Sequence, residues 1–366
     1  MGRVSLVKTT QGIKEGLVEA LDLIGGLGHY IETRDRVMLK PNLNGLEGYT
    51  SRELVEALLQ LLLDWGVREV FMGESTFGGV QHTNVFFKKT GFTELAERYG
   101  VDLVNLNASE AVVVQVENGL ILDRVRVAKE ALEADKIINL PNMKVHYATG
   151  VSLALKNMKG VLVGDEKRRF HEVGLDRAIA DLNHTVRPHL NIVDCISCME
   201  RMGPRGGDVV DLDLIMAGGD SAEVDCVGCA IMGYGVSEVR HLEHYIDVNG
   251  LDPNGIAVVG AAIEAVRYPF KKVQLEGVVP EGLKIHNRDA CSSCMNALLL
   301  SCGVLQGDLK ERVDVYLGSS VEADDAPGIK VAFGNCCPED MAVDKRIKGC
   351  PPYPFALRDC LSPYLK

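Results

Sequence analysis

Short apolar runs alternate with amphipathic stretches through the first half of the chain, and this alternation constrains the fold more than any other feature. Continuous or alternating apolar runs predict strands, whereas apolar residues spaced three and four apart predict helices. The expected strands are 4–8, 36–39, 69–72 and 102–106. The helices expected between them are about 13–24, 51–65 and 83–99. Repeated βα units of this kind predict an α/β fold, with a mainly parallel sheet flanked by helices.

A hairpin and a second group of elements follow. The runs 112–116 and 120–127 flank Glu117-Asn118-Gly119, a turn sequence that favours an antiparallel ribbon inserted on the sheet. Later elements are expected as strands at 136–140, 190–193 and 212–217, and as helices at 175–183 and 221–232. Glycines and a proline at 277–282 mark a boundary. We therefore expect an α/β domain over 1–276 and a smaller, cysteine-rich α+β iron-sulfur module over 277–366.

Charge and hydropathy limit the partners and the compartment. The formal net charge of −12 argues against nucleic acid, because phosphate binding needs clustered positive charge. No apolar run reaches the roughly 18 residues that a membrane span needs, and the first residues do not resemble a signal peptide. An odd number of cysteines, 11, favours reduced thiols over disulfides. We expect a cytoplasmic protein that binds neither nucleic acid nor membrane, with homodimer formation left open.

Cysteines are confined to the second half of the chain, where all 11 lie between residues 195 and 360. The C-terminal set consists of Cys291, Cys294, Cys336, Cys337 and Cys350. A [4Fe-4S] cluster needs four thiolates from several directions, and this set supplies them with either member of the doublet as a ligand. The string Gly349-Cys350-Pro351-Pro352 is similar to the cluster loop in small subunits of hydrogenases and respiratory complex I. Zinc with the same ligands, or unligated core thiols, are the alternatives.

Two further CxxC pairs form a second set, Cys195 with Cys198 and Cys226 with Cys229. The first pair is expected in a loop after a strand. The second is expected inside a helix, where residues three apart share a face. Their spacing favours a second iron-sulfur cluster, with zinc or buried redox thiols as alternatives.

Basic and amide side chains gather near the ends of predicted strands, which is where open α/β sheets bind ligands. They predict a positive pocket for the carboxylate or phosphate groups of an anionic small molecule. The residues expected to bind substrate are Lys40, Asn42, Asn142, Asn157 and Lys159. The residues expected to act in catalysis are His146, His171, Lys144 and Lys156. Imidazole suits acid/base work because it titrates near neutral pH. The run 167–169 is interpreted as solvated surface charge.

Several short strings lie along the larger domain: Lys40-Pro41-Asn42-Leu43, Gly73-Glu74-Ser75, 140–146 and 155–160, followed by His171, Asp194, Met199-Glu200, Gly203-Pro204 and 222–225. Together these strings resemble one family, the group catalogued as domain of unknown function 362. They occur in the family's order from about residue 3 to residue 250. The resemblance implies an α/β fold and an association with iron-sulfur proteins, but no particular reaction. The sequence departs from the family pattern at the second cysteine set, where mostly small or apolar residues are expected.

The cysteine sets and the predicted pocket together favour an iron-sulfur oxidoreductase that passes electrons between its cluster or clusters and an anionic small molecule. One alternative is a non-redox isomerase or lyase that uses a cluster or metal as a Lewis acid. Another is an electron-transfer or scaffold subunit of a larger redox complex. A ferredoxin-type protein is the expected redox partner. Neither a GxGxxG fingerprint nor a Walker motif occurs, so we expect no site of those types.

Overall fold

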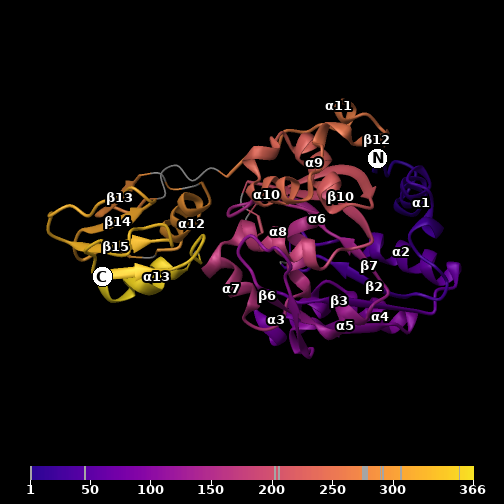
Figure 1. Ribbon diagram of the computed structural model, residues 1–366, viewed down its shortest axis with the longest axis horizontal. Coiled ribbons are helices and arrows are strands. Elements are labelled where there is room, and N and C mark those ends of the chain that lie inside the picture. Colours follow the sequence, from indigo (N-terminus) through magenta and orange to yellow (C-terminus); the bar gives the residue numbers. More distant parts are fainter. Residues whose placement is uncertain are drawn as a thin grey trace. The chain divides into compact units, whose positions relative to one another are not determined.

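The computed structural model describes residues 2–366, apart from 45–46, 202, 205–206, 274–278, 289, 291, 306 and 354. The chain divides into two compact units (Figure 1). The larger unit comprises Met1–His146, Val151–Lys167 and Asp176–Lys272. The smaller unit comprises Tyr147–Gly150, Arg168–Leu175 and Val273–Lys366. The domain boundary predicted at 276/277 falls among residues 274–278, outside the described residues.

Within the described chain, ten strands form the sheet of the larger unit, in the order β12-β1-β11-β10-β7-β2-β3-β4 with β8 and β9 off this path. The run from β10 to β4 is parallel, as is the pair β1 and β12, whereas β11 is antiparallel to both neighbours. The predicted, mainly parallel sheet is confirmed. The strands are β1 (Arg3–Lys8), β2 (Arg36–Pro41), β3 (Glu69–Glu74), β4 (Asp102–Asn105), β7 (Lys136–Leu140), β8 (Asn142–His146), β9 (Gly150–Ser152), β10 (Leu190–Glu200), β11 (Asp208–Gly218) and β12 (Ala257–Gly260).

Helices flank this sheet on both faces (Figure 1). Leu54 and Leu58 of α2 share a core with alternate strand residues such as Ile215. Met216, the next residue of β11, points the other way because side chains alternate along a strand, and it meets α9 at Gly228. The helices that begin before residue 273 are α1 (Ile13–Leu23), α2 (Arg52–Trp65), α3 (Gly79–Lys89), α4 (Phe92–Tyr99), α5 (Lys129–Glu133), α6 (Ala154–Asn157), the 3-10 helix η3 (Met158–Val161), α7 (Glu166–Val173), α8 (Leu175–Thr185), α9 (Ser221–Met232), α10 (Arg240–Asn249) and α11 (Ile263–Val266).

Strands β10 and β11 are longer than the sequence predicts, with 11 residues each. Their antiparallel pairing continues as far as Glu200 opposite Asp208. The apolar pattern predicts shorter strands, because polar residues interrupt the apolar run in the second half of β10 and the first half of β11. Cys195 and Cys198 consequently lie within β10, and the prediction that they lie in a loop is wrong.

The predicted hairpin forms a separate two-stranded sheet of β5 (Ala111–Gln115) and β6 (Arg124–Ala128). Its second strand begins later than the apolar pattern indicates. Three consecutive backbone N–H groups, at 120–122, donate to the Asp181 carboxylate at 2.7–3.0 Å instead of joining the ladder. A side chain distant in sequence therefore sets this strand boundary.

The smaller unit holds a sheet of described strands in the order β13-β14-β15-β16, all parallel. The helix α12 connects β13 to β14, because a parallel neighbour requires a crossover. This arrangement is of the α/β type, so the α+β prediction for this module is wrong. The elements are β13 (Leu283–Asn287), α12 (Ser292–Gly303), β14 (Val313–Leu317), β15 (Ile329–Phe333), β16 (Lys345–Ile347) and α13 (Ala356–Leu361).

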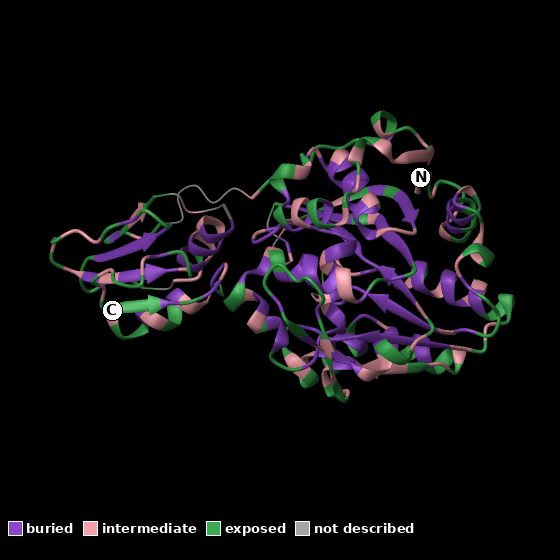
Figure 2. Cartoon of the chain, in the orientation of Figure 1, coloured by how far each residue is buried: buried purple, intermediate pink, exposed green. Residues whose placement is uncertain are grey.

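The two faces of the smaller sheet have different cores. Val313 and Val315 pack with residues of α12 and α13. Tyr316, which alternates with them on β14, packs with Cys337 in a second cluster. In Figure 2, buried residues run along the strands of both units. Among the described helices, none is long and apolar enough to cross a membrane.

Candidate functional site

The carboxyl ends of β2, β3 and β7 meet at one edge of the larger sheet because these strands are parallel. The chain order reverses beside β2, since β3 and β4 extend the sheet on one side and β7 lies on the other. Open α/β sheets bind ligands outside the carboxyl ends of their strands at such a reversal. Lys40, near the end of β2, and Glu74, at the end of β3, are therefore placed at this edge.

A small pocket with a volume of about 60 Å³ opens at this edge, and three lysines contribute to its wall. We term it the lysine pocket. Its described lining residues are Asn42, Asn44, Glu74, Ser75, Phe77, Ser152, Lys156, Asn157, Lys159, Gly160 and Lys167. The structure thus brings together four residues that the sequence assigned to substrate binding or catalysis, namely Asn42, Lys156, Asn157 and Lys159.

A buried ion pair lies beside the pocket. Lys40 Nζ donates to Glu74 Oε2 at 2.8 Å, and both side chains are almost fully shielded from solvent. The other carboxylate oxygen of Glu74 accepts the backbone N–H of Ser75 at 2.7 Å. Gly160 is required at this point, because a Cβ there would overlap both Glu74 Oε1 and Lys40 Nζ. Lys40 therefore does not line the pocket itself but holds Glu74, which does, in position.

Amide side chains connect neighbouring strands beneath the pocket. Asn42 Nδ2 donates to Asn157 Oδ1 at 2.9 Å, and Asn157 Nδ2 donates to Asn139 Oδ1 at 2.8 Å. Lys144 Nζ donates to Asn42 Oδ1 at 2.7 Å and to the Gly48 carbonyl at 2.6 Å. Lys144 is 1% exposed, so it orients Asn42 from behind and does not reach the wall itself.

Lys167 is a functional candidate that the sequence reading placed wrongly. It is buried in the pocket wall, where its amine donates to Ser75 Oγ and, at 2.8 Å, to the Leu162 carbonyl. The interpretation of this residue as solvated surface charge is therefore wrong, although the adjacent Arg168 is exposed. The overlooked signal is Phe170, which is buried and lies three residues on, on the same face of α7.

Lys156 and Lys159 project from a short segment made of α6 and η3. Asp225 fixes the start of this segment, because its carboxylate accepts the backbone N–H groups of Ala154 at 2.7 Å and of Leu155 at 3.1 Å. Residues three apart share a helical face, so both amines are directed to the same side. Both lysines are partly buried.

Burial lowers the pKa of every lysine at this edge, because it penalises the charged amine. The pKa falls to about 7 for Lys144, Lys159 and Lys167. It falls well below the ordinary value for Lys156, where burial is reinforced by the positive charges of Lys159 and Lys144. The carboxylate of Asp176 opposes the effect at Lys159 and Lys156. A bound anion would favour the charged amines in the same way.

Besides Lys40 and Lys144, three further predicted site residues are not among the described residues that line the pocket. Asn142 donates to the Ser197 carbonyl at 2.8 Å and so joins β8 to β10. His146 is buried at the end of β8. His171 belongs to the smaller unit, where its Nδ1 lies 3.4 Å from the Pro351 carbonyl oxygen. The two histidines that we expected as candidates for acid/base catalysis therefore lie in different units.

The second cysteine set is buried in two separate elements. Cys195 and Cys198 lie in β10, and Cys226 and Cys229 lie in α9. Burial raises the pKa of all four thiols. No three of these four described sulfurs lie within 4.8 Å of one another. Tetrahedral zinc, with Zn–S bonds of about 2.3 Å, requires sulfurs roughly 3.8 Å apart.

Three C-terminal thiols lie at the carboxyl edge of the smaller sheet. Cys294 is in the first turn of the helix after β13, and Cys336 and Cys350 follow β15 and β16. A Cβ at Gly334 would lie 3.3 Å from Cys294 Sγ, so this glycine keeps the space beside that sulfur open. Cys291 lies outside the described residues.

Reciprocal hydrogen bonds join the loops that follow β15 and β16. The Asn335 N–H donates to the Gly349 carbonyl at 3.0 Å, and the Gly349 N–H donates to Asn335 Oδ1 at 2.7 Å. These bonds hold the residues that immediately precede Cys336 and Cys350 together. The chemistry of three thiols at one edge fits a cluster that takes thiolates from several loops.

Cys337 is placed differently from its neighbour in the doublet. Its Sγ donates to the Tyr316 carbonyl at 3.2 Å, in the core on the face opposite α12. Cys294 packs in the core on the α12 face. Cys336 is exposed. The geometry therefore favours Cys336, and not Cys337, as the available thiol of this doublet.

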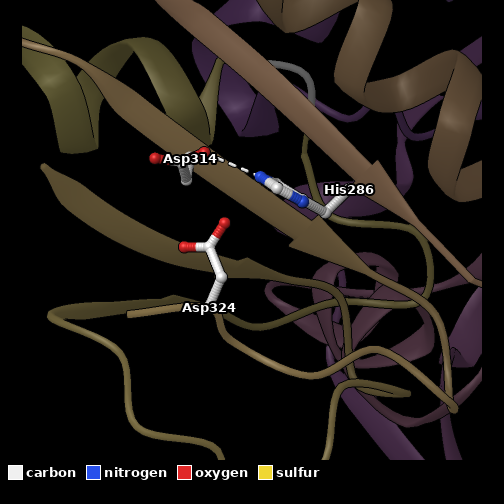
Figure 3. A group of neighbouring side chains, drawn as sticks. All are labelled: His286, Asp314 and Asp324. Carbon is white, nitrogen blue, oxygen red and sulfur yellow. Dashed lines mark hydrogen bonds and ion pairs between the residues drawn. The ribbon is translucent and has the colours of Figure 1, made fainter. Parts of the chain in front are cut away.

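A third group of side chains lies on the smaller sheet and combines His286, Asp314 and Asp324, whose polar atoms all lie within 4.8 Å of one another (Figure 3). His286 Nε2 lies 2.7 Å from Asp314 Oδ1. Arg312 Nε lies 2.7 Å from the other Asp314 oxygen. Although burial acts to raise the pKa of Asp314, bonds from Arg312 and His286 lower it. The guanidinium neutralises this carboxylate, so the group is an ion-pair network that links β13 to β14.

Residues 37–230 match the family model described as Domain of unknown function (DUF362). The chain belongs to this family. All described residues that line the lysine pocket fall within the part that matches DUF362. The thiols at the carboxyl edge of the smaller sheet lie beyond it. The pocket is thus a feature of the DUF362 region, and the C-terminal cysteines are additional to it.

One relative of the chain is a thylakoid-associated protein of Synechocystis sp.. The two are 31% identical over 222 residues, which amount to 57% of this chain and 66% of that protein. The match therefore spans just under two thirds of the relative's length. A crystal structure of a Thermotoga maritima protein aligns over 83% of this chain and 70% of that chain, at 14% identity and a TM-score of 0.37. This similarity is too low to establish a common fold.

Proposed function

We propose that the chain is an enzyme that binds an anionic small molecule in the lysine pocket. The observation that carries the proposal is the pocket wall, where three lysine amines gather at the reversal point of an α/β sheet. The protein as a whole has a net charge of −12, so this concentration of lysine amines is a local feature. Burying an amine is unfavourable unless a negative partner compensates it, and a bound anion supplies that partner.

The pocket volume limits the size of the ligand. A single water molecule needs roughly 10–15 Å³ of cavity, so about 60 Å³ accommodates a group of about four to six non-hydrogen atoms. Sites for drug-sized ligands are larger, at about 300–1,000 Å³. The pocket therefore suits a small carboxylate or a phosphate group and is too small to enclose a nucleotide.

Anion binding is tested by thermal unfolding of the full chain with phosphate, acetate or pyruvate at constant ionic strength. A ligand that binds only the folded state raises the melting temperature, and at a given concentration a tighter ligand raises it more. We expect Lys159→Gln to reduce this response. Lys88→Gln, which removes an exposed charge on α3, serves as the matched control and should respond like the wild type. Equal responses of Lys159→Gln and the wild type would refute the proposed site.

The second candidate function is iron-sulfur binding by the smaller unit. It is favoured by the placement of Cys294, Cys336 and Cys350 at one edge of the smaller sheet, with Cys291 as the fourth thiolate. A [4Fe-4S] cluster bound there would supply one-electron chemistry. Gly334 leaves room beside the Cys294 sulfur, which supports the fit. Zinc with the same ligands is the alternative occupant.

Anaerobic reconstitution followed by iron and sulfide counts tests the second candidate. We expect the Cys294→Ser, Cys336→Ser and Cys350→Ser variants to lose the cluster. Cys337→Ser should retain it, because that thiol is engaged with the Tyr316 carbonyl on the other face of the sheet. A cluster that survives Cys336→Ser and is lost in Cys337→Ser would contradict the assignment. Stoichiometric zinc without iron would support the zinc alternative.

Both sites in one chain would make an oxidoreductase that passes electrons between a cluster and the bound anion, with a ferredoxin-type protein as redox partner. A non-redox isomerase or lyase, or an electron-transfer subunit, remains the alternative. A second cluster on the cysteines of β10 and α9 has weaker support, because all four of these thiols are buried within a strand and a helix. The proposed compartment is the cytoplasm, where reduced thiols persist, and no described cysteine forms a disulfide.

A further inference from the structure

Lys156 differs from the other lysines at the carboxyl edge of the larger sheet in the partners of its amine. Lys40 donates to Glu74, Lys144 to Asn42, and Lys167 to Ser75. Within the described part of the chain, the Lys156 amine makes no hydrogen bond and no ion pair. It nevertheless lines the lysine pocket, so it is available to a bound molecule.

The surroundings of Lys156 favour the neutral, nucleophilic form of its amine. Burial and the positive charges of Lys159 and Lys144 all act against protonation of this amine. Desolvation and a neighbouring cation are the two means by which enzymes activate a lysine as a nucleophile. The carboxylate of Asp176 raises the pKa of Lys156, but its effect is smaller than that of either lysine.

We propose that Lys156 is a catalytic residue that forms a Schiff base with the carbonyl carbon of a small oxo acid bound in the lysine pocket. This inference rests on the proposed function, because it assumes that the pocket holds an anion. Lys159 and Lys167, which line the same pocket, hold the carboxylate of the oxo acid as charged amines. The two lysines thus have different roles. The Lys156 amine is left without a partner to react, whereas hydrogen bonds hold Lys167 in place to bind the carboxylate.

The step balances without any further reactant. The lone pair of the Lys156 nitrogen forms a bond to the carbonyl carbon, and the π pair of the C=O bond moves to oxygen. Both protons of the neutral amine finally reside on that oxygen, which leaves as water when the C=N bond forms. No oxidant or reductant is consumed. The product is an imine between Lys156 and the substrate carbon, which withdraws electrons from the adjacent bonds of the substrate.

The dimensions of the pocket indicate the substrate class. A volume of about 60 Å³ admits on the order of four to six non-hydrogen atoms. Glyoxylate and pyruvate, each with one carboxylate and one adjacent carbonyl, meet this limit. Asn157 and Ser152 add uncharged polar groups to the same wall. A short 2-oxo acid therefore satisfies both the charge and the size of the pocket.

Borohydride trapping of the full chain with glyoxylate or pyruvate tests the inference. Reduction of the imine leaves a stable adduct whose mass is that of the probe minus one oxygen atom. We expect this adduct on the peptide that contains Lys156, and we expect its loss in Lys156→Arg. The Lys88→Arg control, which alters an exposed lysine on α3, should give the wild-type adduct. Fluorescence of Trp65, the single tryptophan, verifies that each variant folds in the larger unit.

The outcomes separate this inference from the proposed function. Stabilisation by pyruvate without any trapped adduct refutes the Schiff base and leaves anion binding intact. An adduct spread equally over exposed lysines, or undiminished in folded Lys156→Arg, also refutes the inference. Absence of both stabilisation and adduct overturns the proposed function itself. An adduct confined to Lys156 supports both.

Discussion

Replacement of Lys144 by methionine tests whether a buried amine at this edge is neutral in the folded protein. Lys144 is 1% exposed, and burial lowers its pKa from 10.5 to about 7. Between these values the unfolded chain binds a proton that the folded chain does not. The free energy of unfolding therefore rises with pH by about 1.4 kcal/mol per pH unit from this residue. Over the whole interval the contribution amounts to roughly 5 kcal/mol.

Methionine has a similar length but no titratable group, so Lys144→Met should lack this rise. Near pH 10, where the wild-type amine is neutral in the fold, the variant should be less stable by about 1–3 kcal/mol. The reason is that Asn42 Oδ1 and the Gly48 carbonyl lose their donor. The difference should shrink by about 1.4 kcal/mol per pH unit as the pH falls and should change sign before pH 7, because the wild type must then release, on folding, a proton that its unfolded chain binds.

Urea unfolding followed by Trp65 fluorescence is the assay. Trp65 is the single tryptophan and lies on α2, so it reports on the larger unit alone. Lys88→Met removes an exposed amine and provides the control, whose stability should parallel that of the wild type at every pH. If the curves of Lys144→Met and the wild type also run parallel from pH 7 to 10, the amine is charged in the fold and the reasoning fails.

Two further predictions concern residues that stabilise each unit. Gly160→Ala should destabilise the larger unit by roughly 1–3 kcal/mol, because the added Cβ forces apart the ion pair of Lys40 and Glu74. An unchanged urea midpoint would show that the backbone adjusts. Asp314→Asn should destabilise the smaller unit by about 1–3 kcal/mol, since Arg312 and His286 lose a charged partner. Faster amide hydrogen exchange along β13 and β14 is the measurement, and unaltered protection would argue against the network.

Much of the larger unit could be predicted from the sequence because its signals are local. Apolar periodicity marks β2 and β3, and parallel strands bring their carboxyl ends to one edge whatever the details of packing. Asn42 and Asn157, which are distant in sequence, could therefore be placed together before any coordinates were known. The two regions meet because β2 and β7 are parallel neighbours in the sheet, although they are distant in sequence.

The errors have a common physical origin in contacts that are distant in sequence. The boundary of β6 depends on the Asp181 carboxylate, which captures the preceding backbone N–H groups. Lys167 sits in a run of charges; Phe170 marks the buried face of α7, but the bond from Lys167 to Ser75, 92 residues away, is not visible in that run. Such information does not reside in a window of neighbouring residues. Pattern reading accordingly succeeded for elements and failed for individual partners.

The division of the chain into two units has a consequence for how this protein could be rearranged. Segments 147–150 and 168–175 belong to the smaller unit, yet they are encoded between parts of the larger one. One of them binds the thiol loop: the Leu175 N–H donates to the Cys350 carbonyl at 3.1 Å, and the Cys350 N–H donates to the His171 carbonyl. A fragment that starts at residue 273 would therefore lack backbone partners of its own cysteine loop. The smaller unit therefore cannot be moved to another protein as one continuous segment. Residues 147–150 and 168–175 would have to be transferred together with residues 273–366.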